Sequence, residues 1–227
     1  MKALVRHIYT LVLLVYNVFF TKFAARKSIF WAVKICNKEK GEVVFKHAYL
    51  HKTKITLSGQ KHKISVEGEI YNTVIEVYGT NNKIVFDEGI QIHNATIILR
   101  GNDLLLYIGK DSRMGGGRII IMGQSNRITI GKECMLSDHL QIWSSDSHPI
   151  FDADMNIINP SLPIIIHDNV WIGSCVTVLK GVTIGEGAII GMNSIVTRDV
   201  PSHSVCVGNP ARMIRSNVSW RREYISI

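Results

Sequence analysis

The fold is decided by residues 166–200, which read IHDNVWIGSCVTVLKGVTIGEGAIIGMNSIVTRDV. Branched apolar residues recur at every sixth position of this stretch, and a small or β-branched residue follows each of them four positions later. A period of six fits neither the roughly 3.6-residue period of an amphipathic helix nor the alternation of one long strand. It predicts short strands joined by tight corners, each sending one side chain inward, stacked as a solenoid.

A longer repeat precedes this stretch. The segments ITLSG, IEVYG, IILRG and IIIMG end at Gly59, Gly79, Gly101 and Gly123, and an Ile or Leu five residues later starts a second alternating strand. The repeats start 20 or 22 residues apart, which is typical of one solenoid coil per repeat. We therefore predict one solenoid over residues 45–215, with a C-terminal cap over the last coil at residues 216–227.

The six-residue pattern fails once, at residues 143–163, which read WSSDSHPIFDADMNIINPSLP. An excursion of this length from a regular solenoid is either a functional loop or a disordered insertion. Its aromatic and apolar residues argue against disorder. The sequence therefore predicts one inserted loop, and this loop is where a functional site is expected.

Residues 166–200 and the turn Gly208-Asn209-Pro210-Ala211-Arg212 resemble the hexapeptide-repeat acyltransferases. Within that superfamily the chain is most similar to O-acetyltransferases of capsule and lipopolysaccharide sugars, including those acting on sialic acid polymers. The resemblance is strongest over 134–215, weaker over 55–133 and absent from the first 45 residues. It implies a left-handed parallel β-helix, acetyl-CoA as the donor and a homotrimer.

The basic charge of the chain is concentrated at its N-terminus. Residues 1–40 carry eight bases and the single acid Glu39, so the other 187 residues carry 18 bases and 17 acids. Such a balanced solenoid has no basic face rich enough to track phosphates, which argues against nucleic acid as a partner. The four cysteines lie far apart and form no CxxC pair, which is typical of reduced thiols in a cytoplasmic protein.

Residues 1–44 are predicted to form a short basic, amphipathic helical segment. The apolar run 8–20 is too short for a membrane span, which needs about 20 residues, and no small-residue cleavage site for a signal peptide follows it. Two interpretations stay open. The segment, through residues 1–40, lies on the anionic surface of the bacterial inner membrane, or it packs against the solenoid or a second subunit. The predicted fold is thus an all-β solenoid with one inserted loop and an N-terminal helical segment.

His148, in the segment Ser144-Ser145-Asp146-Ser147-His148-Pro149, is the candidate general base. Acetyl transfer to an alcohol requires a group that takes the hydroxyl proton near neutral pH, and imidazole suits this role. The resemblance implies the same role for a His in such a loop. Asp146 is the candidate that orients the imidazole, and Ser145 and Trp143 are candidate substrate contacts.

The donor site is predicted from the resemblance and from the chemistry of acetyl-CoA. Trp171 is expected to point outward near the foot of the loop, as a wall for the pantetheine arm or the acceptor. Gly173 and Gly191 offer close backbone approach. Bases toward the C-terminal coils are the candidates for the phosphates: Lys180, Arg198, Arg212 and Arg215. The histidines lack the matched spacing of a zinc site, so we predict no metal.

The sequence thus favours an acetyl-CoA-dependent O-acetyltransferase that modifies a sugar hydroxyl of a bacterial capsule or lipopolysaccharide glycan. Two alternatives stay open. An enzyme with the same coils could acetylate the amino group of a nucleotide sugar or an antibiotic. A non-catalytic solenoid scaffold could use the loop to bind a partner.

Overall fold

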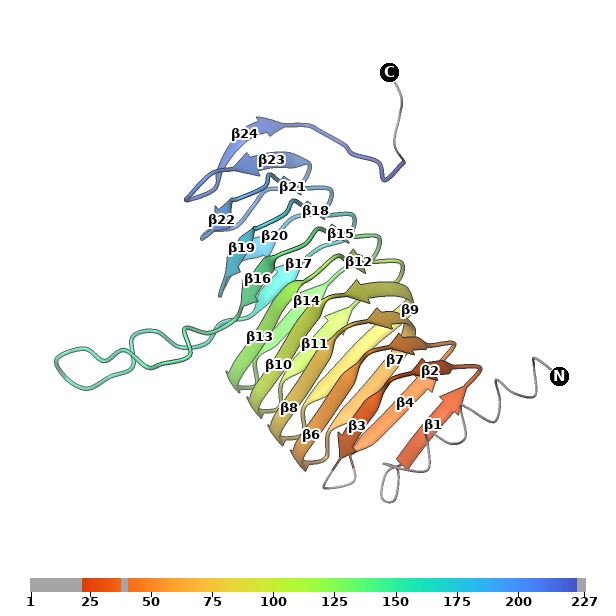
Figure 1. The fold of residues 1–227 in the computed structure, drawn as a ribbon. Helices are drawn as coiled ribbons and strands as arrows, with labels where there is room; N and C mark the ends of the chain where they lie inside the picture. The colour runs from red at the N-terminus through yellow and green to blue at the C-terminus, as the bar shows by residue number, and fades with distance from the viewer. Residues whose placement is uncertain (1–21, 38–40, 224–227) are drawn as a thin grey trace.

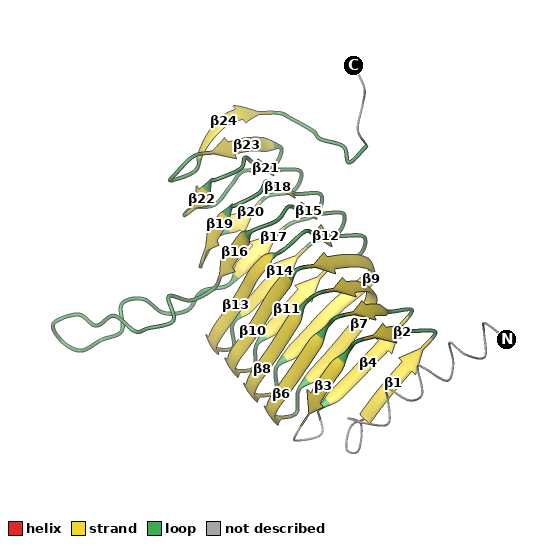
Figure 2. Cartoon of the chain, in the orientation of Figure 1, coloured by secondary structure: helices red, strands yellow, loops and turns green. Residues whose placement is uncertain are grey.

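The computed structural model describes residues 22–37 and 41–223 of the 227-residue chain. This described part is built from 24 strands and contains no helix (Figures 1 and 2). The strands stack in parallel into a three-sided solenoid, and one long arm projects from it (Figure 1). The predicted all-β fold, a left-handed β-helix with one inserted loop, is confirmed.

Successive strands of each coil lie on three faces of the solenoid. Face 1 consists of β1 (Lys22–Arg26), β4 (Glu42–Lys46), β11 (Leu105–Ile108), β14 (Arg127–Ile130), β17 (Ile164–Ile166) and β20 (Thr183–Ile184). Face 2 consists of β2 (Ile29–Trp31), β5 (Tyr49–His51), β12 (Arg113–Met114), β15 (Met135–Leu136), β18 (Trp171–Ile172), β21 (Ile189–Ile190), β23 (Ser204–Val207) and β24 (Arg212–Ser216). The long strands β7 (Lys63–Tyr71) and β9 (Lys83–His93) turn the corner and belong to both faces. Face 3 consists of β3 (Lys34–Asn37), β6 (Lys54–Gln60), β8 (Val74–Thr80), β10 (Ala95–Asn102), β13 (Gly117–Gln124), β16 (Leu140–Trp143), β19 (Thr177–Leu179) and β22 (Ile195–Val196).

The core is made of inward side chains stacked in columns along the axis. On face 3 the register places Ile97 beside Ile119, Ile119 beside Ile142, and Ile142 beside Val178. All four side chains are fully buried. Since burying one such side chain contributes about 1.5–3 kcal/mol, these columns are what hold the coils together.

The repeated glycines at the end of face 3 allow neighbouring coils to approach closely. Gly79 and Gly101 have positive φ values of 110° and 137°, a region that side-chain-bearing residues rarely adopt. A Cβ on Gly79 would lie 1.9 Å from the carbonyl oxygen of Gly101, and one on Gly101 would lie equally close to that of Gly123. The glycine that ends each repeat therefore makes room for the backbone of the next coil.

The N-terminal boundary of the solenoid differs from the prediction. Strands β1, β2 and β3 occupy residues 22–37, where a helical segment was expected, and they pair in parallel with β4, β5 and β6. The helical prediction is therefore wrong for residues 22–37, because tertiary pairing with the next coil overrides local amphipathicity. The solenoid begins before residue 45, and residues 1–21 lie outside the described residues. Among the residues that are described, none form a helix of the length and apolarity that a membrane span requires.

The C-terminal end also differs from a simple cap over the last coil. Strand β24 turns back and pairs antiparallel with β23, which ends the parallel stack. The chain then runs back along the corner between faces 1 and 2. There the Trp220 indole N–H donates to the carbonyl of Asn169 at 2.7 Å, and Arg222 donates to that of Asp111 at 3.0 Å. Residues 217–223 thus fasten earlier coils rather than covering the last one.

Candidate functional site

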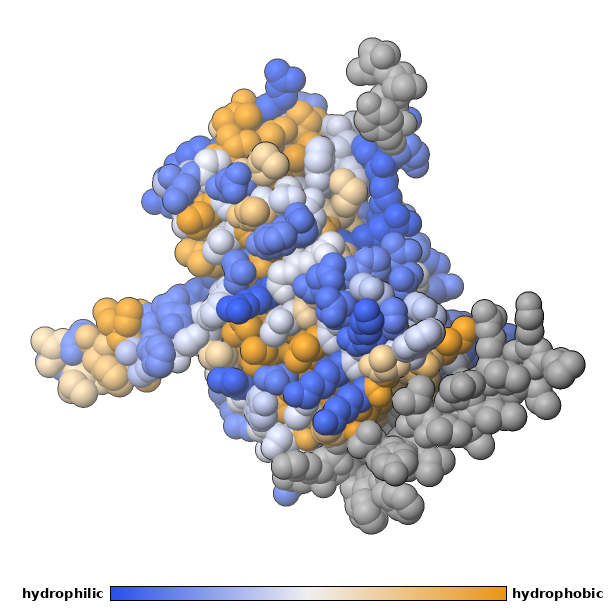
Figure 3. Space-filling view, viewed as in Figure 1, coloured by the Kyte–Doolittle hydropathy of each residue, from blue (hydrophilic) through white to orange (hydrophobic). Residues whose placement is uncertain are grey.

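The inserted loop forms an extended arm that we define as residues 144–163, between β16 and β17 (Figure 1). Its two limbs pair as a hairpin: Phe151 and Ile157 form an antiparallel bridge, and the N–H of Ile158 donates to the carbonyl of Ile150 at 2.9 Å. Apolar side chains lie exposed along it (Figure 3). The exposed members are Ile150, Phe151, Met155, Ile157, Ile158 and Leu162.

Hydrogen bonds at its root fix the arm to the solenoid. Ser144 is fully buried, and its hydroxyl oxygen accepts from the Asn126 side chain at 2.9 Å. Farther out, the Asn159 amide nitrogen donates to the Asp146 carboxylate and to the carbonyl of His148, both at 2.9 Å. Lys180 donates to the same carboxylate and to the carbonyl of Asn159. These contacts fix the backbone on either side of His148.

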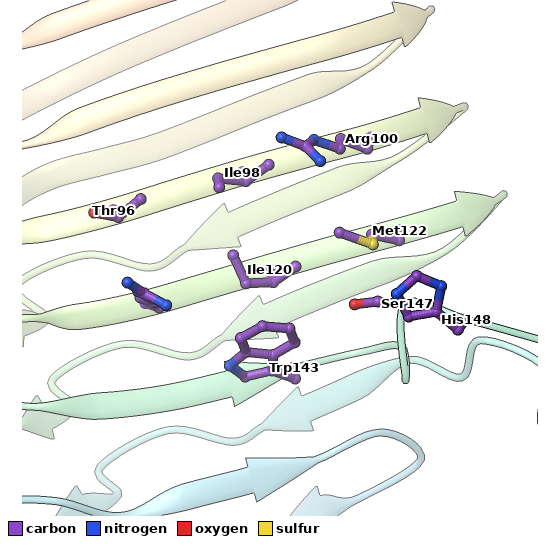
Figure 4. Close-up of a pocket in the computed structure, with 9 residues that line it drawn as sticks. Thr96, Ile98, Arg100, Ile120, Met122, Trp143, Ser147 and His148 are labelled. Atoms are coloured by element: carbon purple, nitrogen blue, oxygen red, sulfur yellow. The ribbon is translucent and has the colours of Figure 1, made fainter.

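A cavity of about 550 Å³ lies where the arm leaves face 3 (Figure 4). Its floor is a column of outward apolar side chains on three adjacent strands, in which Ile98 lies beside Ile120, and Ile120 beside Trp143. The Trp143 indole N–H donates to the Gln141 side chain at 3.0 Å, which fixes the ring. The cavity therefore combines an aromatic wall with an apolar floor, as ligand pockets generally do.

Polar side chains surround this floor. The register places Arg118 beside Thr96 at one end of the floor and Arg100 beside Met122 at the other. Ser147 and His148 reach in from the arm (Figure 4). Arg100 also lies over the ring of Tyr78, with 5.4 Å between its guanidinium carbon and the ring centroid. The cavity thus combines an exposed imidazole with two guanidinium groups, which suits a ligand carrying both a reactive hydroxyl and a negative charge.

The structure brings together some of the residues predicted from the sequence and separates others. Trp143 and His148 line one cavity, whereas Ser147 rather than Ser145 completes its polar edge. The hydroxyl oxygen of Ser145 instead accepts from the N–H of Ser147 at 3.1 Å, which supports the turn before His148.

Asp146 does not orient the imidazole as predicted. Its carboxylate accepts from Lys180 and Asn159, and the Lys180 hydrogen bond is the main reason that the pKa of Asp146 is lowered. Lys180, predicted as a phosphate contact, is engaged in this pairing, and only 18% of its side chain is exposed. Both residues therefore position the arm, because the fold brings residue 180 beside residue 146.

Trp171 points outward as predicted, with 37% of its surface exposed, but it lies on face 2 and not at the foot of the arm. Its ring packs against that of Trp220, with 5.9 Å between the centroids. Within one chain, Trp171 therefore contacts the C-terminal tail, which we define as residues 217–223, and not a space for the predicted ligand.

The remaining predicted donor contacts lie on the last coils. The missing side chain of Gly173 makes room for the backbone nitrogen of Met192, and that of Gly191 makes room for Val207. Both glycines are thus explained by coil stacking. Arg198, Arg212 and Arg215 are exposed, and Arg212 donates to the adjacent carbonyl of Ala211 at 2.9 Å.

Sequence reasoning missed the two cavity arginines, although a signal was present. Arg100 follows the inward Leu99 and Arg118 precedes the inward Ile119, so alternation along each strand turns both arginines outward. Aligning the repeats by their outward positions would have placed both on one face. In the described part of the chain, no cluster of three or more His, Cys, Asp or Glu side chains is arranged to hold a metal ion.

Residues 163–198 match the family of bacterial transferase hexapeptides (six repeats). A polysialic acid O-acetyltransferase of Escherichia coli O1:K1 / APEC is 36% identical over 118 residues, which cover 52% of this chain and 38% of that protein. The chain therefore spans about two fifths of the length of this curated relative.

Two solved structures have similar folds over most of their length. The polysialic acid O-acetyltransferase OatWY superposes with a TM-score of 0.76 at 25% identity, covering 89% of this chain and 92% of that one. The polySia-specific acetyltransferase NeuO superposes with a TM-score of 0.58 at 28% identity, covering 89% and 90%. The predicted resemblance to hexapeptide-repeat acyltransferases, and among them to sialic acid O-acetyltransferases, is confirmed.

Proposed function

We propose that this protein is an acetyl-CoA-dependent O-acetyltransferase that modifies a sugar hydroxyl of a bacterial capsule or lipopolysaccharide glycan. The observation that carries the proposal is the position of His148, which lines one cavity together with Trp143, Arg100 and Arg118. The similarity to polysialic acid O-acetyltransferases supports the reaction type.

In the proposed reaction His148 takes the proton of the acceptor hydroxyl as the alcohol oxygen attacks the thioester carbonyl carbon. The tetrahedral intermediate then collapses, the carbon–sulfur bond breaks, and the imidazolium returns its proton to the departing thiolate. The products are an acetyl ester and the free thiol of coenzyme A. A backbone N–H would stabilise the oxyanion of the intermediate.

The charge of the cavity suggests what kind of acceptor it takes. Arg100 and Arg118 flank the apolar floor, and a guanidinium can bind a carboxylate through two parallel hydrogen bonds. Trp143 offers a flat apolar surface for a sugar ring. We therefore propose a glycan that carries carboxylate groups as the acceptor.

The donor would lie on face 3, toward the C-terminal coils. Leu179 is 39% exposed and lies beside Trp143, so the apolar column of the cavity continues across β19 toward the exposed Arg198. An apolar track that ends at a base fits a pantetheine arm followed by phosphates. Arg212 and Arg215 are further candidates for the phosphates, and no step requires a metal.

We propose a homotrimer in which the apolar arm packs on a neighbouring copy. Six large side chains of the arm are between 43% and 71% exposed, which is unusual for a loop surrounded by water. A cytoplasmic location, with residues 1–40 touching the inner membrane, stays a prediction because residues 1–21 lie outside the described residues.

The test is to follow thiol release from acetyl-CoA with polysialic acid, lipopolysaccharide polysaccharide and amino sugars as acceptors. We expect His148→Ala to reduce transfer about 10²- to 10⁴-fold without changing the melting temperature. His139→Ala is the matched control, because its imidazole is also exposed but lies outside the cavity.

Three outcomes would contradict the proposal. Full activity of His148→Ala would place the base elsewhere. Transfer only to amino groups would favour an N-acetyltransferase, and no turnover with any acceptor would favour a scaffold.

A further inference from the structure

Four outward rings form a ladder at the corner between faces 2 and 3. The register places Trp31 beside His51, His51 beside Tyr71, and Tyr71 beside His93, one ring on each of four successive coils. The ring centroids are 5.6, 4.7 and 5.9 Å apart, and each pair meets edge to face. We call these four residues the ring ladder. They stand on β2, β5, β7 and β9, which pair in that order, and the labels β2, β7 and β9 mark the place in Figure 1.

The ladder is accessible to a ligand. Trp31 is 63% exposed, and the other three rings are half-buried. Core packing does not explain such a row, because the inward columns of these coils are filled by other side chains, such as Leu50 and Ile70. An aromatic ring combines an apolar face carrying partial negative charge with a polar edge, which suits the C–H surfaces and hydroxyl groups of sugars.

Basic side chains lie directly around the corner from the ladder. Lys52 follows His51, and Lys34 and Lys54 are paired in register on face 3. Glu69 is the acid beside the ladder, and it lies 3.4 Å from the His93 ring nitrogen. Three exposed bases against one paired acid favour an anionic ligand.

The ladder is continuous with the cavity. His93 ends β9, and three residues later Thr96 lines the cavity on β10. With about 4.8 Å between neighbouring strands, the ladder adds about 14 Å of surface along the axis below the cavity. A linear ligand held in the cavity could therefore extend along the ladder, whereas a single sugar could not.

We propose that the ring ladder binds the unreacted part of an acidic polysaccharide chain whose reacting sugar occupies the cavity. The inference rests on the proposed function for the identity of the chain, but binding to the ladder needs no turnover. The protein would then prefer long acceptors to short ones.

Binding is tested first, with His148→Ala as the background so that no transfer occurs. Immobilised polysialic acid should retain this protein, and the additional changes Trp31→Ala, His51→Ala and Tyr71→Ala together should weaken retention about tenfold or more. His139→Ala is the matched control and should leave retention unchanged. Melting curves of every variant establish that the coils remain folded.

Kinetics give the second test. In a protein that keeps His148, the three changes Trp31→Ala, His51→Ala and Tyr71→Ala together should raise KM for the polymer about tenfold. The kcat for the polymer and the kinetics with a short sialic acid oligomer should stay unchanged. Three results would overturn the proposal: equal retention of the protein on immobilised neutral amylose, undiminished retention of the triple variant on polysialic acid, or an equal KM change for the short acceptor. If the ladder binds polymer but no acceptor is acetylated, the proposed function fails and the ladder does not.

Discussion

Asn159 connects the two limbs of the arm, and we expect its removal to impair catalysis without unfolding the protein. Its side chain makes three hydrogen bonds: to the Asp146 carboxylate and the His148 carbonyl at 2.9 Å, and from the N–H of Ile150 at 2.6 Å. Asn159→Ala removes all three. The carbonyl of Asn159, which accepts from Lys180, is unaffected.

The expected loss of activity in Asn159→Ala follows from these contacts. Each hydrogen bond contributes about 0.5–1.5 kcal/mol net, and all three are exposed, so together they stabilise the ordered root of the arm by about 1–2 kcal/mol. A difference of that size corresponds to about a 5- to 30-fold change in the ratio of ordered to disordered arm. We expect kcat/KM to fall by up to that factor, with an unchanged melting temperature, because the core columns lie elsewhere.

Thiol release and melting curves measure these two effects. Asn156→Ala is the matched control: its side-chain amide bonds only to Asp152 near the tip of the arm, so its activity should stay within about twofold of the parent enzyme. A double-mutant cycle sharpens the test, because Asn159→Ala should have little further effect once His148 is Ala. Unchanged activity of Asn159→Ala, or the same loss in the His148→Ala background, would refute a positioning role.

Three further predictions concern the root of the arm, the coil stack and the tail. The pKa of Asp146 lies below its ordinary value near 3.8, mainly because of the Lys180 hydrogen bond. The stability of this contact is therefore fully present above that value and is lost as pH falls through the lowered pKa. Lys180→Met should speed hydrogen exchange in the arm at neutral pH. The difference from the parent should become smaller in acid, because the Asp146 contact titrates whereas the bond to the Asn159 carbonyl does not. Gly79→Ala should destabilise the protein by more than about 4 kcal/mol, because its Cβ would meet a backbone oxygen at 1.9 Å, and denaturant unfolding measures the loss. Trp220→Phe should cost about 1 kcal/mol through its lost N–H bond and speed exchange in residues 217–223.

Each of these predictions has a result that contradicts it. A difference between Lys180→Met and the parent that is equally large at neutral pH and in acid would show that the ion pair does not fix the arm. Gly123→Ala is the comparison for Gly79→Ala: its Cβ would first meet a serine side chain, which can move, so it should be the milder change. Exchange in the tail that does not respond to Trp220→Phe would mean that other contacts hold it.

The sequence predicted the solenoid because its repeat is a local pattern. Inward residues such as Ile172 and Val178 recur at a fixed spacing, and any chain with that spacing buries them only by stacking. The interruption at residues 143–163 was visible for the same reason. The helical prediction for residues 22–37 is wrong, because the weaker pattern there does not reveal that strands β1 to β3 pair with the next coil.

The sequence by itself thus determined the coils, the arm and His148 as the candidate base, since each follows from order along the chain. Only the tertiary structure decided which side chains meet across coils. Arg100 and Arg118 come to flank the cavity, Lys180 takes Asp146 away from the imidazole, and Trp171 turns to a different face. Stacking sets these contacts, because it places residues 20 or more positions apart within hydrogen-bonding distance, and no local pattern records which outward residues will be neighbours.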